Sequence, residues 1–246
     1  MTWVKSGIAT FFKQPLALAG LFFLYMAGII VLAQIPFIGT FIGGMLVPGA
    51  TLGLMAASAE AAKGKFPMPT VLLSAFRAGR ERGRAMLILG VIYTAGSLLA
   101  TRLAMLLAGG SGAPAQGTEI DTTALLALVL HTPLFLMFWH APALVHWHGV
   151  SPLKSLFFSV VACFRNFGAF AVYGITWLGV FLGAGIVFAL IGGMLGGAGM
   201  ARTIMMPTAL LLAAMFSTSI YFTFRDSFVA DEPQPPESPN DTAHPG

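Results

Sequence analysis

Six long apolar segments constrain the fold of this chain more than any other feature. A helix that crosses a lipid bilayer needs about 20 mostly apolar residues. Six windows of the 246-residue chain meet this requirement, namely residues 16–34, 41–59, 85–108, 123–145, 168–190 and 204–224. Because these windows are apolar on all sides, their length and not their periodicity identifies them. The sequence therefore predicts an all-α, polytopic membrane bundle of six transmembrane helices.

The composition excludes most classes of soluble protein. Charged residues make up 9% of the chain and hydrophobic residues 57%, whereas soluble domains carry about 25% charged residues. So few charges cannot cover the surface of a soluble domain of this size. The single cysteine, Cys163, allows no internal disulfide and no cysteine-based metal site. We therefore expect neither a soluble enzyme nor a nucleic-acid-binding protein.

The basic residues predict how the spans are oriented. With both termini in the cytoplasm, 11 of the 13 Lys and Arg residues fall in cytoplasmic segments, and only Arg102 and Arg202 fall outside. Cytoplasmic segments of membrane proteins carry such an excess of Lys and Arg. Arg102 follows Arg84 by about 27 Å along a helix, so its side chain extends to the outer interface. We predict a multi-pass protein of the bacterial inner membrane.

Amphipathic segments precede the spans on the predicted cytoplasmic side. In residues 152–166 the apolar residues follow helical spacing, with Ser151 as the expected N-cap and Pro152 in the first turn. The apolar positions are Leu153, Leu156, Phe157, Val160, Val161 and Phe164. Residues 1–14 repeat this pattern, and residues 70–84 form a weaker but more basic copy. We expect cytoplasmic amphipathic helices that lie in the plane of the membrane interface.

The amphipathic segments and spans are interpreted as one integral membrane domain, residues 1–230, built from three repeated units. The units are residues 1–66, 67–150 and 151–230, and each is an interfacial helix followed by two spans. The second span of each unit carries a proline, Pro48, Pro142 or Pro207. The alternative is that any cytoplasmic segment entering a bilayer is basic and aromatic, without repetition.

Two further local features follow from composition. Pro133 and Pro142 both fall in the fourth span, which predicts that this span is kinked or interrupted. Residues 231–246 are acidic, rich in proline and almost free of apolar residues. Such a segment cannot bury enough surface to fold, so we expect a disordered cytoplasmic tail.

Histidines of the fourth span are the first candidates for a functional site. His140, deep in the span, is the candidate intramembrane polar site, together with Trp139 and with His148 at the cytoplasmic exit. The alternative is a structural, hydrogen-bonded His140. His131 lies nine residues earlier and hence on the opposite helix face. No Cys, Asp or Glu near these histidines in the sequence completes a metal site. We expect no metal and no cofactor.

Basic residues on the predicted cytoplasmic side are the second candidates. Arg77, Arg80, Arg82 and Arg84 fall within eight residues before the third span, and Lys154 and Arg165 belong to the amphipathic segment 152–166. Basic side chains at a membrane surface attract anionic lipid with about 1 kcal/mol each. The alternative is that they only fix the orientation of the spans. We predict that these six residues bind lipid headgroups or a partner protein.

Acidic residues are nearly absent from the spans, which argues against catalysis and ion-coupled transport. Glu60 closes the second span, and no other acid enters one. Motifs of serine hydrolases, zinc proteases and P-loop nucleotide-binding proteins are absent.

We therefore predict a non-enzymatic integral inner-membrane protein that binds lipid or a partner through a basic cytoplasmic face. The alternative is a transporter or channel for a small neutral or hydrophobic solute, because interrupted helices often line binding sites. Transport predicts a mid-membrane cavity lined by His140, Tyr93, Thr94, Ser97 or Trp139.

Residues 141–166 also carry a resemblance to a known family. The stretches 141–145, 147–152, 156–159 and 162–166, with residues 14–18 before the first span, resemble an uncharacterised family of proteobacterial six-span inner-membrane proteins. The resemblance covers most of residues 11–228. His140 and His146 depart from it, where apolar residues are expected. It implies the six-span fold but no substrate and no catalytic residue. The layout is more distantly similar to the membrane domain of some glycerophosphodiester phosphodiesterases, a likeness that carries no activity.

Overall fold

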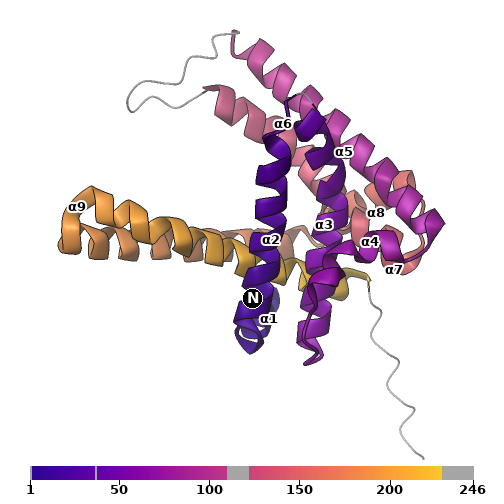
Figure 1. The fold of residues 1–246 in the computed structure, drawn as a ribbon. Coiled ribbons are helices and arrows are strands. Elements are labelled where there is room, and N and C mark those ends of the chain that lie inside the picture. The colour runs from indigo at the N-terminus through magenta and orange to yellow at the C-terminus, as the bar shows by residue number, and fades with distance from the viewer. Residues whose placement is uncertain (1, 37, 110–121, 229–246) are drawn as a thin grey trace, which may run out of the picture.

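The computed structural model describes residues 2–36, 38–109 and 122–228, and the regular structure of these residues is helical throughout (Figure 1). The helices, in chain order, are α1 (Thr2–Lys13), α2 (Pro15–Ala33), α3 (Ile38–Ala62), the 3₁₀ helix η1 (Pro69–Leu73), α4 (Ser74–Arg77), α5 (Arg80–Leu107), α6 (Thr122–Phe138), α7 (Ala141–His148), α8 (Pro152–Arg165) and α9 (Phe167–Phe228). Six stretches within them are long and apolar enough to cross a membrane. The predicted all-α membrane fold is confirmed, whereas the predicted tail, residues 231–246, lies outside the described residues.

The fifth and sixth spans are both part of α9, which folds back on itself as a hairpin (Figure 1). The two spans are Phe167–Met194 and Thr203–Phe228. The hydroxyl oxygens of Tyr173 and Ser219 lie 2.7 Å apart, so the two halves of the hairpin are in direct contact. Gly197, between the spans, has φ = +76°, which glycine adopts without a steric penalty. A glycine at this position permits the chain to reverse.

The fourth span is interrupted between α6 and α7, as predicted, and the structure shows how its backbone is satisfied. In a continuous helix the N–H of His140 would donate to the carbonyl of Leu136. Here the hydroxyl of Ser159, on α8, stands between these groups. Its oxygen accepts a hydrogen bond from the His140 N–H at 3.0 Å, and its O–H donates to the Leu136 carbonyl at 2.7 Å. An inserted side chain opens a helix at this point, whereas Pro133 lies inside α6 without interrupting it.

Close backbone approaches hold α3 against the segment that follows it. A Cβ atom built on Gly90 of α5 would collide with the backbone of Met45 on α3. One built on Gly53 of α3 would lie 2.6 Å from the Cα of Leu72 in η1. Because Gly53 precedes the end of α3 by about 13 Å along the helix axis, η1 folds back beside α3. The first part of the predicted basic segment 70–84 therefore packs against α3.

α8 exists with almost the predicted bounds, and one of its faces packs against the bundle. Its buried face consists of Leu156, from the predicted apolar stripe, and four small residues, Ser155, Ser159, Ala162 and Cys163. Leu153, Phe157 and Phe164, which belong to the predicted apolar stripe, are each more than 60% exposed. Ser151 occupies the N-cap position, but its side chain makes no capping hydrogen bond. α8 therefore packs on the bundle through Leu156 and small side chains, and its other large apolar side chains point outward.

α1 is docked on α9. Its buried face includes Trp3, Val4 and Phe11. A Cβ atom built on Gly7 would collide with the Cβ of Ser219 in α9, so the two helices approach closely. The Trp3 indole Nε1–H donates to the Asp226 carboxylate at 2.8 Å. Both contacts tie the beginning of the described chain to its last helix.

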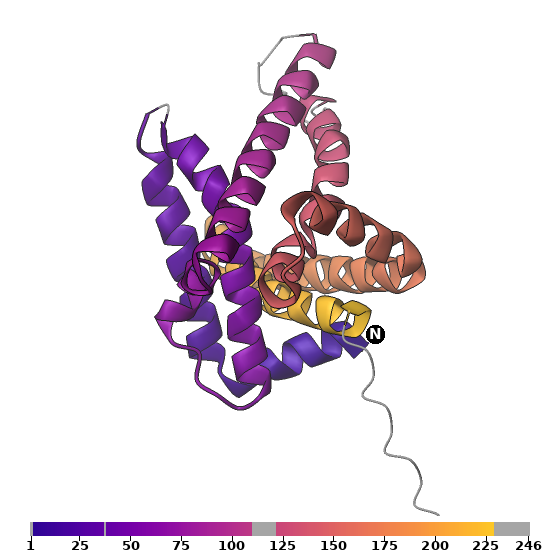
Figure 2. The same cartoon turned by 90° about the vertical axis from the view of Figure 1, so that its right-hand side faces the viewer.

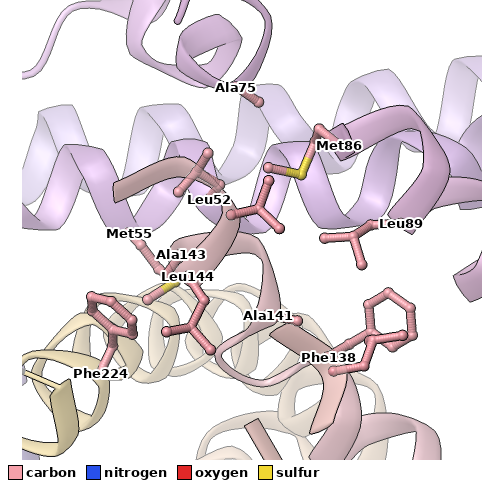
Figure 3. Packing of buried hydrophobic residues seen from close by; sticks show 12 residues of the cluster. Leu52, Met55, Ala75, Met86, Leu89, Phe138, Ala141, Ala143, Leu144 and Phe224 are labelled. Carbon is pink, nitrogen blue, oxygen red and sulfur yellow. The ribbon is translucent and has the colours of Figure 1, made fainter. Parts of the chain in front are cut away.

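A buried core lies where α3, α4, α5, α7 and the end of α9 meet (Figure 3). Leu52, Met86 and Leu89 are almost completely shielded there. Away from this core the spans diverge, since the α2–α3 and α5–α6 pairs separate toward one end in Figure 2. The α9 hairpin extends across the direction of α2 (Figure 1). This core surrounds the short helices α4 and α7, and two further buried clusters join α1, α2 and α9 to the rest of the described bundle.

Candidate functional site

The intramembrane candidate His140 lies in an aromatic cage at the interruption between α6 and α7. The side chain is fully buried, and neither ring nitrogen has a hydrogen-bond partner among the described residues. The ring centroids of Phe170, Phe224 and Phe228 lie 5.8, 5.9 and 5.2 Å from that of His140. The predicted hydrogen-bonded side chain is therefore not observed, because only the backbone N–H of His140 is bonded. Within the described residues no side chain bonds this ring in a way that would relay a proton.

Trp139 and His148 do not complete a polar site with His140. The Trp139 indole donates to the Thr223 hydroxyl at 2.9 Å and points to the sixth span. His148 is exposed, and its ring centroid lies 5.8 Å from that of Phe224. The three predicted residues are neighbours of the same aromatic cluster but make no polar contact with one another.

A polar stripe on the sixth span was missed from the sequence. Three indole groups donate to it: Trp177 to Ser219 at 3.2 Å, Trp139 to Thr223 at 2.9 Å and Trp3 to Asp226 at 2.8 Å. Ser219, Thr223 and Asp226 are four and three residues apart, so they share one helix face. This spacing could have been noticed in the sequence, but it does not indicate which side chains donate to the stripe. The stripe attaches the fifth span, the fourth span and α1 to the sixth span.

An apolar cavity of about 360 Å³ lies between α6, α8 and the α9 hairpin. Trp139, Phe135, Phe170 and Tyr173 are among its lining residues, and almost all of its surface is apolar. Of the side chains expected to line a transport cavity, Trp139 is found here. Three others are engaged elsewhere: Tyr93 packs on Phe138, Thr94 donates to the Gly90 carbonyl, and Ser97 bonds His131.

A polar pocket of about 450 Å³ lies where α3 ends, between the η1–α4 segment and α7. Its polar lining residues are Glu60, Thr70, Ser74, Arg77 and His146, and the name polar pocket is kept for this set. They come from three separate stretches of the chain, which the fold-back of η1 beside α3 brings together. The sequence predicted Arg77 as a site residue. No acidic residue lies near His146 in the sequence, whereas the structure brings Glu60 into the same pocket.

The polar groups of this pocket have unused hydrogen-bonding and charge capacity. Ser74 Oγ and His146 Nδ1 are buried and bond no described residue. Glu60 and Arg77 line the same pocket, but neither forms an ion pair with another described residue. Arg82 lies near enough to His146 for its charge to act on the ring. The pocket therefore offers an anion-binding side and a single carboxylate.

The six predicted basic residues are all exposed. Arg77 ends α4, Arg80, Arg82 and Arg84 occupy the first turns of α5, and Lys154 and Arg165 lie near the two ends of α8. Figure 1 shows α4, α7 and α8 gathered beside the beginning of α5. Arg165 is separate from this group and lines another pocket with Asn166 and Asp226.

Cys163 has the properties of a structural cysteine. The thiol is buried on the packed face of α8, with its sulfur 4.0 Å from the Leu136 carbonyl oxygen. Burial raises the pKa of this thiol to about 11. The reactive thiolate form is therefore scarce at neutral pH. Among the described residues, no three His, Cys, Asp or Glu side chains converge to hold a metal ion.

Comparison of the sequence with curated proteins identifies the family of this chain. A probable inner membrane protein of Burkholderia thailandensis is 36% identical to the chain over 253 residues. The match covers 97% of this chain and 94% of the relative. The chain belongs to the family of that protein.

Family membership confirms the resemblance predicted from residues 141–166 and the location in a membrane. The six apolar helices make the family member a multi-pass integral protein. No family model and no solved structure matches the chain. The cytoplasmic location of the termini and the threefold repeat stay predictions.

Proposed function

We propose that the protein binds anionic lipid headgroups through its basic face, which consists of Arg77, Arg80, Arg82, Arg84 and Lys154, and through Arg165, which lies apart from that face. One observation carries this proposal. All six side chains are exposed, and none pairs with a carboxylate of another described residue. Their charge is therefore free to act on a ligand. We further propose that this face is cytoplasmic, which agrees with the excess of basic residues in those segments.

The type of basic residue favours phosphate as the ligand. Five of the six are arginines, and a guanidinium group binds phosphate oxygens through two parallel hydrogen bonds. Arg80, Arg82 and Arg84 lie at the beginning of α5, where unpaired backbone N–H groups also favour anions. Both features strengthen contact with a phosphate-containing headgroup.

The surroundings favour lipid over a soluble partner protein. On α8, Leu153 and Phe157 are exposed close to Lys154, and Phe164 is exposed beside Arg165. Large apolar side chains next to basic ones are typical of a helix that contacts acyl chains and headgroups together. A soluble partner would leave part of this surface in water.

The test compares the purified full chain with a variant carrying Arg80→Gln, Arg82→Gln and Arg84→Gln. Native mass spectrometry measures the retention of phosphatidylglycerol against phosphatidylcholine with identical acyl chains. We expect the parent to retain phosphatidylglycerol better than phosphatidylcholine. In the variant the ratio of the two retentions falls by about tenfold or more. Arg102→Gln is the matched control, because Arg102 is exposed on the same helix but near its other end. A parent without preference, or a variant equal to the parent, would contradict the proposal.

Transport of a small solute stays a prediction. The apolar cavity lined by Trp139 supports a hydrophobic solute more than a polar one, because its walls offer almost no hydrogen-bonding groups. His140 is packed in its aromatic cage and presents no free face to a polar solute. The lipid-binding proposal has the broader support, since it uses both the charges and the exposed apolar residues.

A further inference from the structure

The polar pocket has features that a simple anion-binding site does not need. Arg77 and the nearby Arg82 supply positive charge, and Thr70 and Ser74 supply hydroxyl groups. These groups suit the oxygens of a phosphate. Glu60, however, would repel a purely anionic ligand from the same pocket. A carboxylate on one wall and a guanidinium on another, without an ion pair between them, match a ligand that carries both signs of charge.

The chemistry of the pocket also distinguishes between kinds of positive group. A primary ammonium has three N–H donors, which a carboxylate accepts directly. A quaternary ammonium has none and is recognised by aromatic rings. The residues that line this pocket beside its polar set are Met68, Val71 and Ala78, so its lining contains no Phe, Tyr or Trp ring. A primary amine therefore suits this pocket better than a quaternary ammonium.

We propose that the polar pocket binds a phosphate ester that carries a primary amine, such as a phosphoethanolamine group. The phosphate contacts Arg77 and the hydroxyl of Ser74, and the ammonium contacts Glu60. Ser74 Oγ, which bonds no described residue, gains a partner in this way. The volume of about 450 Å³ lies within the range of small-molecule sites. This inference rests on the proposed lipid-binding function, for which it names a preferred headgroup.

The test uses the full chain and three lipids with identical acyl chains, phosphatidylethanolamine, phosphatidylcholine and phosphatidylglycerol. Native mass spectrometry measures how much of each is retained. We expect the parent to retain phosphatidylethanolamine about tenfold better than phosphatidylcholine, a difference of about 1.4 kcal/mol. Glu60→Gln removes this difference because an amide is uncharged, and it leaves phosphatidylglycerol binding equal or stronger.

Glu81→Gln is the matched control, since Glu81 is an exposed acid in the first turn of α5 outside the pocket. This variant keeps the preference for phosphatidylethanolamine. Equal retention of phosphatidylethanolamine and phosphatidylcholine by the parent overturns the inference, and so does an unchanged preference in Glu60→Gln. The proposed function fails on a different contrast, phosphatidylglycerol against phosphatidylcholine, so the two failures are distinguishable.

A second measurement identifies the source of the ligand. Free O-phosphoethanolamine is added to the parent, and the melting temperature is followed in detergent. A rise that Glu60→Gln abolishes supports the same site with a soluble ester as ligand. No rise, together with the lipid preference described above, supports a lipid-borne headgroup. A rise that Glu60→Gln leaves intact overturns the assignment of the ammonium to Glu60.

Discussion

The hydroxyl of Ser159 replaces a backbone hydrogen bond inside the fourth span. It bonds both the Leu136 carbonyl and the His140 N–H, so its removal leaves the His140 N–H without a partner and the Leu136 carbonyl with only the weak Cys163 thiol donor. Each unsatisfied buried group costs about 1–3 kcal/mol. We expect Ser159→Ala to lower the free energy of unfolding by about 2 kcal/mol or more, measured by denaturation in detergent.

Ser155→Ala is the control for this prediction. Ser155 is equally buried on the same helix, but its hydroxyl donates only to the Pro152 carbonyl three residues earlier. Its loss removes no hydrogen bond from the interrupted fourth span, so the free energy of unfolding falls by less. Equal effects of the two substitutions would show that the hydroxyl of Ser159 does not hold the interruption.

Residue types predicted the interruption of the fourth span but not its mechanism. Pro133 and Pro142 both pointed to a break, and the structure places it immediately before Pro142. The partner Ser159 is on another helix, and nothing in its local sequence distinguishes it from Ser155. Long-range hydrogen bonds of this kind depend on tertiary packing, which helical periodicity does not encode.

Among the elements, α8 shows where helical spacing is informative and where it is not. The spacing predicted the helix correctly, and its buried face carries four small residues beside Leu156. In water the large apolar side chains of an amphipathic helix would be buried. Next to a membrane, lipid accommodates them, and small residues allow close helix contact. The periodicity therefore locates the helix, but the surrounding solvent decides which face packs.

The polar pocket illustrates the same limit for a site. Arg77 was predicted as a site residue from the density of arginines, while Glu60 and His146 were each considered alone. Their convergence depends on η1 folding back beside α3, which the close contact of Gly53 with Leu72 permits. The chain has 29 glycines, and the sequence does not indicate which of them makes such a contact.

The docking of α1 on α9 depends on the absence of a side chain at Gly7. A methyl group there would collide with Ser219, and overpacking of this kind costs about 1–3 kcal/mol. We expect Gly7→Ala to release α1, so that its backbone amides exchange with deuterium faster while the amides of α5 keep their protection.

Gly20→Ala in α2 is the matched control, because a Cβ atom there meets nothing within 4 Å. This substitution therefore leaves the exchange of α1 unchanged. Alanine is also a better helix former than glycine, so α2 itself is not weakened. If α1 in Gly7→Ala exchanged as slowly as in the parent, the close contact with Ser219 would not determine its position.

For the whole molecule, the direction of the α9 hairpin is the feature with most consequence. The hairpin extends across the direction of α2 (Figure 1), and its distal part exposes large apolar residues. Leu182, Ile186, Leu190 and Met194 are each more than 55% exposed. Such a surface is stable only in contact with lipid or another apolar surface. Both halves of the hairpin are long enough to span a bilayer, so we expect its tip to reach the side opposite the basic face.

Single cysteines introduced at three positions test this arrangement in intact cells without an outer membrane. Lys65→Cys lies on the predicted cytoplasmic side, Ala108→Cys follows the third span, and Gly199→Cys lies at the tip of the hairpin. The native Cys163 remains in place, because its raised pKa of about 11 keeps the thiol protonated at pH 7. The unsubstituted chain, treated in parallel, measures its residual labelling.

A membrane-impermeant maleimide is expected to label positions 108 and 199 from outside and position 65 only after the membrane is permeabilised. This outcome follows if the excess of basic residues sets the orientation and the hairpin crosses the bilayer. Labelling of position 65 alone from outside would show that the whole protein has the opposite orientation to the predicted one. Labelling of position 108 but not 199 would mean that the α9 hairpin lies along the membrane, in the direction Figure 1 gives it, and that the chain crosses the bilayer four times. The tip of α9 therefore separates a six-span protein from a four-span protein with an in-plane hairpin.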